Sequence, residues 1–297
     1  MAGLRFHTLD VFTDRAFSGN PLAVFTQCGN LADDAMQRLA RELNLSETVF
    51  VGAPTGPGRF PVRIFTPARE LPFAGHPTVG TALLLDALGV LDGSPGASRD
   101  VVLEQGVGPV PVSIETNAGR RMARFRTARL PETGPSSLGR ADAAALVGLD
   151  PARIVADPAV ASCGVPFQLI EVADAAALGT AALDPAQWRR QLATDAVRDV
   201  YCFTRHGASA NVRARMFAPS MNIAEDPATG AAAAALAGYL AGQERDDGTH
   251  ALEIEQGIEM GRPSLIRTEV VRRGGQIEAV FVSGQAVMLS EGTFHLP

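Results

Sequence analysis

The sequence contains an internal repeat that recurs about half a chain later. Four short motifs occur twice in the same order: Gly-Asn-Pro-Leu at 19–22 and Gly-Val-Pro-Phe at 164–167, Phe-x-Pro at 65–67 and 217–219, His-Pro-x-x-Gly at 76–80 and Asp-Pro-x-x-Gly at 226–230, and Glu-Gln-Gly at 104–106 and 255–257. Each match alone is weak, but all four offsets lie between 145 and 152 residues. We therefore predict two copies of one fold.

In each copy, proline opens an apolar, nearly uncharged run, at residues 77–90 and 227–242. Proline is favoured at the first helical position, so we expect His76 and Asp226 at the N-cap, where Asp is usual and His is not. The free N–H groups and the positive end of each helix dipole would favour a carboxylate. The alternative is two ordinary capped helices. Two such helix starts in matching copies favour a carboxylate-binding site.

Composition excludes several classes of protein. At 297 residues the chain can form about two domains. The net charge of −6 and the lack of a basic stripe argue against nucleic acid as a partner. The longest charge-poor run, residues 227–243, is too short and too rich in alanine to cross a membrane. The chain begins directly with a strand pattern and not with a signal peptide, so we expect a cytoplasmic protein.

The 26 basic residues are all arginine. Without lysine, a pyridoxal phosphate Schiff base and a Gly-Lys-Ser/Thr phosphate loop are both excluded. No Gly-x-Gly-x-x-Gly motif follows a strand, which argues against a dinucleotide fold. The three cysteines are widely spaced and match neither a metal pattern nor a disulfide framework. We expect no cofactor.

The pattern along the chain predicts an α+β fold. Alternating segments at residues 4–12, 21–26, 46–51 and 60–65 indicate strands. Leu31, Ala35, Leu39 and Leu43 indicate a surface helix that Asn44 ends. The alanine-rich run after residue 230 fits a helix closely wrapped by strands, because small side chains allow close approach. We predict two halves, residues 1–118 with 277–297 (central helix 77–90) and residues 119–276 (central helix 227–242). Each is a curved, mostly antiparallel sheet around its helix.

Several longer motifs resemble the phenazine biosynthesis-like (PhzF-like) family over nearly the whole chain. They are Asp-Val-Phe-Thr at 10–13, Phe-Ser-Gly-Asn-Pro-Leu-Ala-Val-Phe at 17–25, Leu-Ser-Glu-Thr-Val-Phe at 45–50, Phe-Ala-Gly-His-Pro-Thr at 73–78, Asp-Pro-Ala-Thr-Gly at 226–230, Gln-Gly at 256–257 and Met-Gly-Arg-Pro-Ser at 260–264. The resemblance implies the diaminopimelate epimerase fold, with the site in the cleft between two similar halves. It also implies a homodimer.

The resemblance further implies cofactor-independent isomerisation by proton transfer on a small carboxylate-bearing substrate. The glutamate of the Ser-Glu-Thr motif, here Glu47, would act as acid and base. The substrate-binding residues would be Asn20, Gly75, His76, Asp226, Gly230 and Ala231. Ala231 departs from the serine that the best-known member of the family has after Asp-Pro-Ala-Thr-Gly. The two thiols of diaminopimelate epimerase are absent, since no cysteine lies at either helix start.

The residues themselves leave three functions open. Burial disfavours a charged carboxylate and raises its pKa, and Glu47 stands among Leu45, Val49 and Val51, although such a glutamate is more often an exposed strand residue. The first function is an isomerase or epimerase, the second is a lyase or hydrolase using Glu47 with His76, and the third is a carboxylate-binding protein without catalysis. No metal is expected, because Glu47, His76 and Asp226 lack the further ligands of a zinc site.

Overall fold

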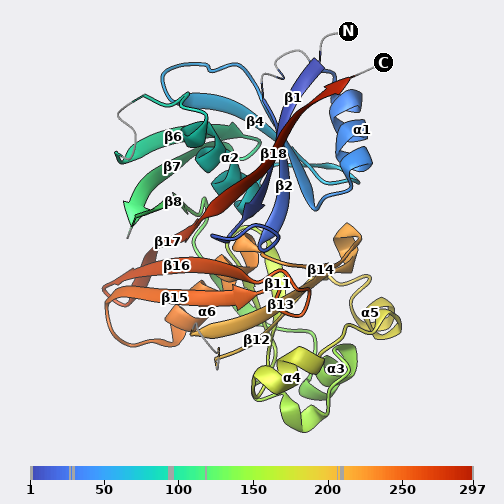
Figure 1. Cartoon of the computed structure of the whole chain (residues 1–297). Coiled ribbons are helices and arrows are strands. Elements are labelled where there is room, and N and C mark those ends of the chain that lie inside the picture. The colour runs from blue at the N-terminus through green and yellow to red at the C-terminus, as the bar shows by residue number, and fades with distance from the viewer. Residues whose placement is uncertain are drawn as a thin grey trace. The chain divides into compact units, whose positions relative to one another are not determined.

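The computed structural model describes residues 3–26, 28, 31–92, 97–117, 119–205, 207 and 211–295. The chain forms two compact units (Figure 1): unit 1 is Met1–Arg126 with Ser283–Pro297, and unit 2 is Thr127–Val282. The sequence placed the boundaries after residues 118 and 276, whereas the units change after residues 126 and 282. The first boundary lies later because residues 120–126 pair with the preceding strand in a hairpin and stay with unit 1.

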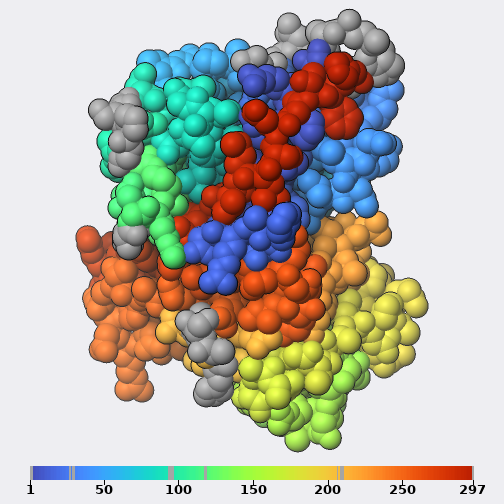
Figure 2. Space-filling view, in the orientation of Figure 1, coloured from blue at the N-terminus to red at the C-terminus, as the bar shows by residue number. Residues whose placement is uncertain are grey.

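Unit 1 is a mostly antiparallel sheet with two helices. Its elements are β1 (Gly3–Val11), β2 (Asn20–Phe25), α1 (Asp33–Leu43), β3 (Glu47–Val51), β4 (Arg59–Phe65), β5 (Glu70–Leu71), α2 (Gly75–Ala87), β6 (Arg99–Gln105), β7 (Gly108–Asn117), β8 (Arg120–Arg126) and β18 (Ala286–His295). The strands pair in the order β18–β1–β2–β3–β4–β6–β7–β8. Only β2–β3 and β4–β6 are parallel. The space-filling view places β18, in red, among the blue residues of unit 1 (Figure 2).

The two helices of unit 1 differ in their surroundings. The surface helix α1 is amphipathic and covers an aromatic cluster in which the rings of Phe25 and Phe50 stack at 5.1 Å. It ends as the sequence predicted, with Asn44 in the left-handed conformation. Every residue of α2 from Gly75 to Leu85 is buried. A helix that is apolar all round must be enclosed on all sides, and α2 is the central helix of unit 1, as predicted.

Unit 2 repeats this plan and adds a group of small helices. Its elements are β9 (Glu132–Pro135), α3 (Arg140–Leu146), η1 (Pro151–Arg153), β10 (Ala159–Ser162), β11 (Pro166–Glu171), α4 (Ala175–Thr180), α5 (Pro185–Gln191), β12 (Val200–Thr204), β13 (Val212–Ala218), η2 (Pro219–Met221), β14 (Ile223–Asp226), α6 (Gly230–Gln243), β15 (Gly248–Gln256), β16 (Ser264–Arg273) and β17 (Gln276–Gly284). The strands pair in the order β9–β10–β11–β12–β13–β15–β16. The alanine-rich α6 is the central helix and is buried from Ala232 to Gly238.

The predicted N-caps of both central helices were wrong. Helix α2 starts at Gly75 with Ala74 as its N-cap, so His76 lies within the first turn. Helix α6 starts at Gly230 with Thr229 as its N-cap, and Asp226 is the last residue of β14. The proline after Asp226 therefore precedes the helix, because side-chain hydrogen bonds hold residues 226–229 in a turn outside it.

Candidate active site

Glu47 is a buried carboxylate at the first position of β3. Strand β3 runs parallel to β2, and the Glu47 backbone stands opposite Leu22. The residue is only 9% exposed, which is unusual for glutamate unless the side chain is paired. Its Oε2 atom lies 3.4 Å from Nδ1 of His76. The predicted acid–base residue therefore contacts the predicted substrate-binding histidine.

His76 is an uncharged histidine in the first turn of α2. It is 4% exposed, and this burial lowers its pKa to about 3, with an opposing effect from the Pro21 backbone. The pair with Glu47 is therefore a contact between a carboxyl group and a neutral ring and not an ion pair. The amide nitrogen of Asn20 lies 3.4 Å from the same Nδ1 atom. Nδ1 can donate to ionised Glu47 in one neutral tautomer of the ring and can accept from Asn20 in the other.

The first turn of α2 has no capping side chain. Its N-cap, Ala74, makes no side-chain capping bond, so the first N–H groups, those of Gly75 and His76 among them, are not capped by that side chain. Such groups at the positive end of a helix dipole bind anions. His76, in this first turn, contacts Glu47, so the start of α2 lies at a place that suits a carboxylate.

The repeated Glu-Gln-Gly motif supports this helix start, a role that the sequence did not reveal. Gln105 donates from Nε2 to the Thr78 hydroxyl at 2.8 Å, and Thr78 in turn donates to the carbonyl of Ala74 at 2.7 Å. A Cβ on Gly106 would lie 2.8 Å from the Cα of Pro72. The glutamine thus ties the first turn of α2 to the end of β6, and the glycine permits the close approach of the two segments.

In unit 2, Gln256 forms the corresponding hydrogen bonds at the start of α6. Its Nε2 donates to the Asp226 carbonyl at 2.7 Å and to the Thr229 hydroxyl at 3.0 Å. The Tyr201 hydroxyl donates to its Oε1 at 3.0 Å. Burial, with a smaller effect of the Asp226 charge, raises the pKa of Tyr201, so this hydroxyl stays a donor. The glutamine of the repeated Glu-Gln-Gly motif therefore forms hydrogen bonds at the start of both central helices.

The remaining predicted residues gather at this second helix start. Thr229 uses its hydroxyl to donate to the Asp226 carboxylate and makes no capping bond to α6. Gly230 is buried at the first helical position, and Ala231 follows it half-buried. The two sets of predicted residues thus form one cluster in each unit: Asn20, Glu47, Gly75 and His76 in unit 1, and Asp226, Gly230 and Ala231 in unit 2.

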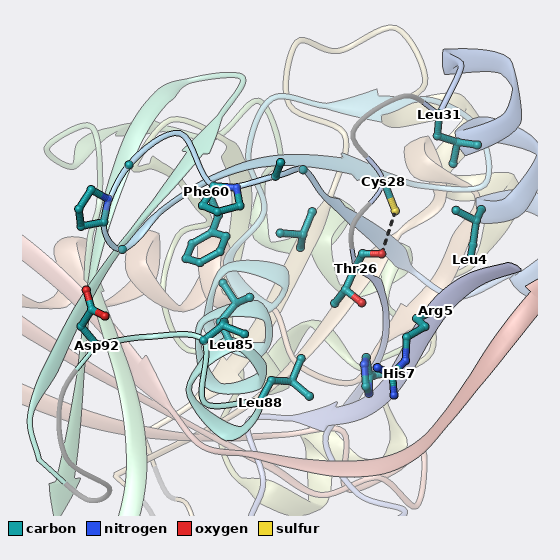
Figure 3. Close-up of a pocket in the computed structure, with 18 residues that line it drawn as sticks. Leu4, Arg5, His7, Thr26, Cys28, Leu31, Phe60, Leu85, Leu88 and Asp92 are labelled. Carbon is teal, nitrogen blue, oxygen red and sulfur yellow. Dashed lines mark hydrogen bonds between the residues drawn. The ribbon is translucent and has the colours of Figure 1, made fainter. Parts of the chain in front are cut away.

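A cavity of about 910 Å³ opens in unit 1 at the other end of α2 (Figure 3). Its lining is largely apolar and includes Leu85, Leu88 and Val51, with Arg5 and His7 on one side. Since α2 has 13 residues, its two ends are separated by about 20 Å. None of the predicted site residues lines this cavity.

Other chemistries find little support in the residues that the structure describes. Cys28 and Cys202 are buried, and burial raises the pKa of each thiol to about 12, so neither is activated as a nucleophile. No group of three or more His, Cys, Asp or Glu side chains lies close enough to hold a metal ion in the described part of the chain. Among the same residues, no helix has the length and apolar character needed to cross a membrane.

Comparison with known proteins shows the family. Residues 9–292 match the family described as phenazine biosynthesis-like protein. An uncharacterized isomerase of Mesorhizobium japonicum is 42% identical, with 95% of this chain and 96% of the relative covered. The trans-2,3-dihydro-3-hydroxyanthranilate isomerase of Pseudomonas aeruginosa is 37% identical, with 98% and 99% covered.

Solved structures show the same fold. A PhzF-family protein of Bacillus anthracis superposes with a TM-score of 0.90 over the full length of both chains at 21% identity. A hydroxyproline epimerase of Agrobacterium vitis superposes with a TM-score of 0.58 over 98% of this chain and 92% of its own at 11% identity. The fold is therefore of the epimerase type that the sequence predicted. On the match to the family over nearly its whole length and on the isomerases among its relatives, the chain belongs to the phenazine biosynthesis-like protein family and is an isomerase.

Proposed function

We propose that this isomerase moves a proton between two carbon atoms of a small carboxylate-bearing substrate, with Glu47 as the acid and base and without a cofactor. The observation that carries the proposal is the contact of the buried Glu47 carboxyl with the neutral His76 ring, at 3.4 Å. An isomerase leaves the composition of its substrate unchanged, so a proton removed at one carbon is replaced in the same molecule, in this proposal at another carbon. One carboxyl group can carry out both steps.

His76 positions Glu47 for both steps. When Glu47 is ionised, Nδ1–H of the ring donates to the carboxylate and holds it in one orientation. When Glu47 has taken the substrate proton, the ring is still neutral, since the pKa of His76 is about 3. A neutral ring does not strongly favour either protonation state of Glu47. General acid–base catalysis of this kind contributes about 10²–10⁴-fold to a rate.

The start of α2 is the proposed binding place for the substrate carboxylate. Proton abstraction next to a carboxylate or a conjugated system builds negative charge in the transition state, and preorganised N–H donors stabilise such charge. The N–H groups of Gly75 and His76 belong to the first turn of the helix whose His76 side chain contacts Glu47, and they would serve this purpose. The roles of Asn20, Asp226, Gly230 and Ala231 as further substrate contacts stay predictions from the family resemblance.

The relatives suggest a substrate. We propose trans-2,3-dihydro-3-hydroxyanthranilate, for which the 37% identical relative is named, as the first compound to test. It has the carboxylate that the start of α2 would bind and a partly unsaturated ring that would stabilise a developing carbanion. The lyase, hydrolase and non-catalytic alternatives lose support, because the relatives of highest identity quoted above are named isomerases.

The test is turnover of this compound in deuterium oxide, followed by proton NMR. We expect deuterium at the carbon that receives the proton and a loss of at least about 10²-fold in rate for Glu47→Gln, which keeps the shape of the side chain but removes its acid–base function. Glu42→Gln, on the exposed side of α1, is the matched control and should keep the wild-type rate. If Glu47→Gln also keeps it, Glu47 is not the acid–base residue.

A further inference from the structure

The loop between β1 and β2 carries an exposed aromatic ring in a strained backbone. Phe17 is 77% exposed, and its φ of 65° lies in the left-handed region. That region is unfavourable for a residue with a Cβ, and a bulky residue there is a true outlier. Phe12, at the other end of the loop, has a φ of 63° but is fully buried. Burial in the core offsets the strain at Phe12, whereas the exposed ring of Phe17 gains nothing comparable.

Buried polar groups hold Phe17 in this conformation. Its backbone N–H donates to the Asp10 carboxylate at 2.6 Å, and Asp10 is fully buried at the end of β1. In the same loop the Thr13 hydroxyl accepts from the Arg15 N–H at 3.1 Å. The conformation is therefore fixed by unit 1 and is not an accident of a loose loop. Backbone strain that the surroundings enforce is typical of functional sites.

The loop leads directly into the candidate active site. Three residues after Phe17, Asn20 begins β2 and places its amide nitrogen 3.4 Å from His76, which contacts Glu47. Three residues span at most about 11 Å, and a phenylalanine ring extends several ångströms beyond its own Cα. The Cα atom of Phe17 is therefore within about 11 Å of the Cα atom of Asn20, in the loop that leads into the site.

We propose that Phe17 determines substrate specificity by packing its ring against a flat, unsaturated ring of the bound substrate. The inference rests on the proposed function and names the class of substrate: cyclic carboxylates with a conjugated ring, rather than open-chain amino or hydroxy acids. Aromatic rings pair favourably in offset or edge-to-face geometry, beyond the effect of buried area alone. Contact with the substrate would give the exposed ring the burial that unit 1 does not.

The experiment measures the affinity of purified variants for 3-hydroxyanthranilate, an aromatic analogue, by calorimetric titration. We expect Phe17→Ala to bind it about 10-fold more weakly, Phe17→Tyr to bind it like the wild type, and Phe17→Leu to lie between them. For turnover, KM should rise by a similar factor and kcat should change little. Leu88→Ala is the matched control, because it removes a partly exposed apolar side chain at the other end of α2.

A stability measurement separates a ligand contact from a structural role. Phe17→Gly should raise the melting temperature, because glycine adopts this φ without strain, and should still weaken binding as Phe17→Ala does. Lower stability together with unchanged affinity would show that the ring serves the fold and would overturn the inference. So would a change in sedimentation on removing the ring, which would assign Phe17 to a subunit interface.

Although the inference rests on the proposed function, the two assignments can fail separately in these measurements. Glu47→Gln, assayed in parallel, should lose exchange and keep affinity for the aromatic probe. If Glu47→Gln is inactive and Phe17→Ala binds the probe normally, the ring-packing inference fails alone. If Glu47→Gln stays active and Phe17→Ala binds weakly, the acid–base assignment fails alone. A wild-type protein that does not bind the probe overturns the inference about ring-containing substrates.

Discussion

At the residue scale, the site depends on side-chain pairs that the sequence could indicate only in part. Glu47 and His76 were predicted through the family motifs, and the structure brings them within 3.4 Å. The hydrogen bonds from Gln105 to Thr78 and from Gln256 to Thr229 were missed, although the repeat of the motif was a visible signal. Partners distant along the chain, and the positive φ of Phe17, follow from tertiary packing, which no local pattern specifies.

The neutral state of His76 predicts how the stability of the protein depends on pH. Its pKa is about 3 in the folded protein, below the ordinary value of 6.5, so the unfolded chain binds one more proton between these two pH values. The contribution of His76 to the free energy of unfolding is therefore fully present above pH 6.5 and is lost as the pH falls toward 3. This group alone should lower the free energy of unfolding by up to about 1.4 kcal/mol per pH unit.

The check is urea denaturation at several pH values between 7 and 4. His76→Asn, which cannot titrate in this range, should show a shallower fall in stability than the wild type. His7 contributes in the same direction, because burial also lowers its pKa. His250→Asn is the control, since that ring lies on β15, is only partly buried and contacts the Asp246 carbonyl. Equal slopes for the wild type and His76→Asn would mean that His76 is not buried in the neutral form.

At the element scale, the two central helices show what composition can and cannot predict. The lack of large side chains in α6 predicted strands packed closely around it, and its buried face confirms this. The exact helix starts were not predictable from the prolines. The side chains of Gln256 and Thr229 hold the turn before α6, so the helix begins four residues after Asp226. Local helix signals thus place an element, and distant hydrogen bonds set its first residue.

Two glycines of α6 predict opposite effects of the same substitution. A Cβ on Gly238 would overlap the ring of Pro131, whereas a Cβ on Gly242 would meet nothing within 4 Å. Gly238→Ala should therefore destabilise unit 2 by about 1–3 kcal/mol through overpacking. Gly242→Ala should stabilise it by about 0.5–1 kcal/mol through helix propensity. Chemical denaturation of both variants is the measurement, and similar effects at the two positions would contradict the close packing around α6.

At the scale of the whole molecule, the duplication was the feature that made the fold predictable. Four weak matches at similar offsets identified two equivalent units, and each unit contains a central helix within a mostly antiparallel sheet. In unit 2, α4 and α5 lie between the parallel strands β11 and β12, as α1 lies between the parallel strands β2 and β3 of unit 1. The homodimer stays a prediction, which sedimentation at micromolar concentration would test.

Metal removal should leave the isomerase activity unchanged. Glu47 and His76 meet without a third ligand of the His, Cys, Asp or Glu type among the described residues, and the positive end of α2 disfavours a cation beside them. Dialysis against EDTA, followed by the exchange assay, should give the untreated rate. A loss of activity that zinc or manganese restores would require a different mechanism.

The pairing of β18 with β1 affects the order in which the two units can fold during synthesis. Strand β18 pairs along the whole of β1 (Figure 1), yet the ribosome translates all of unit 2 between these two strands. Since synthesis adds about 5–20 residues per second, one edge of β1 stays unpaired for on the order of ten seconds or more. An open edge of this kind is a template for pairing with other chains. During synthesis, unit 2 can therefore complete its fold before unit 1, and the nascent chain is most prone to aggregate in that interval.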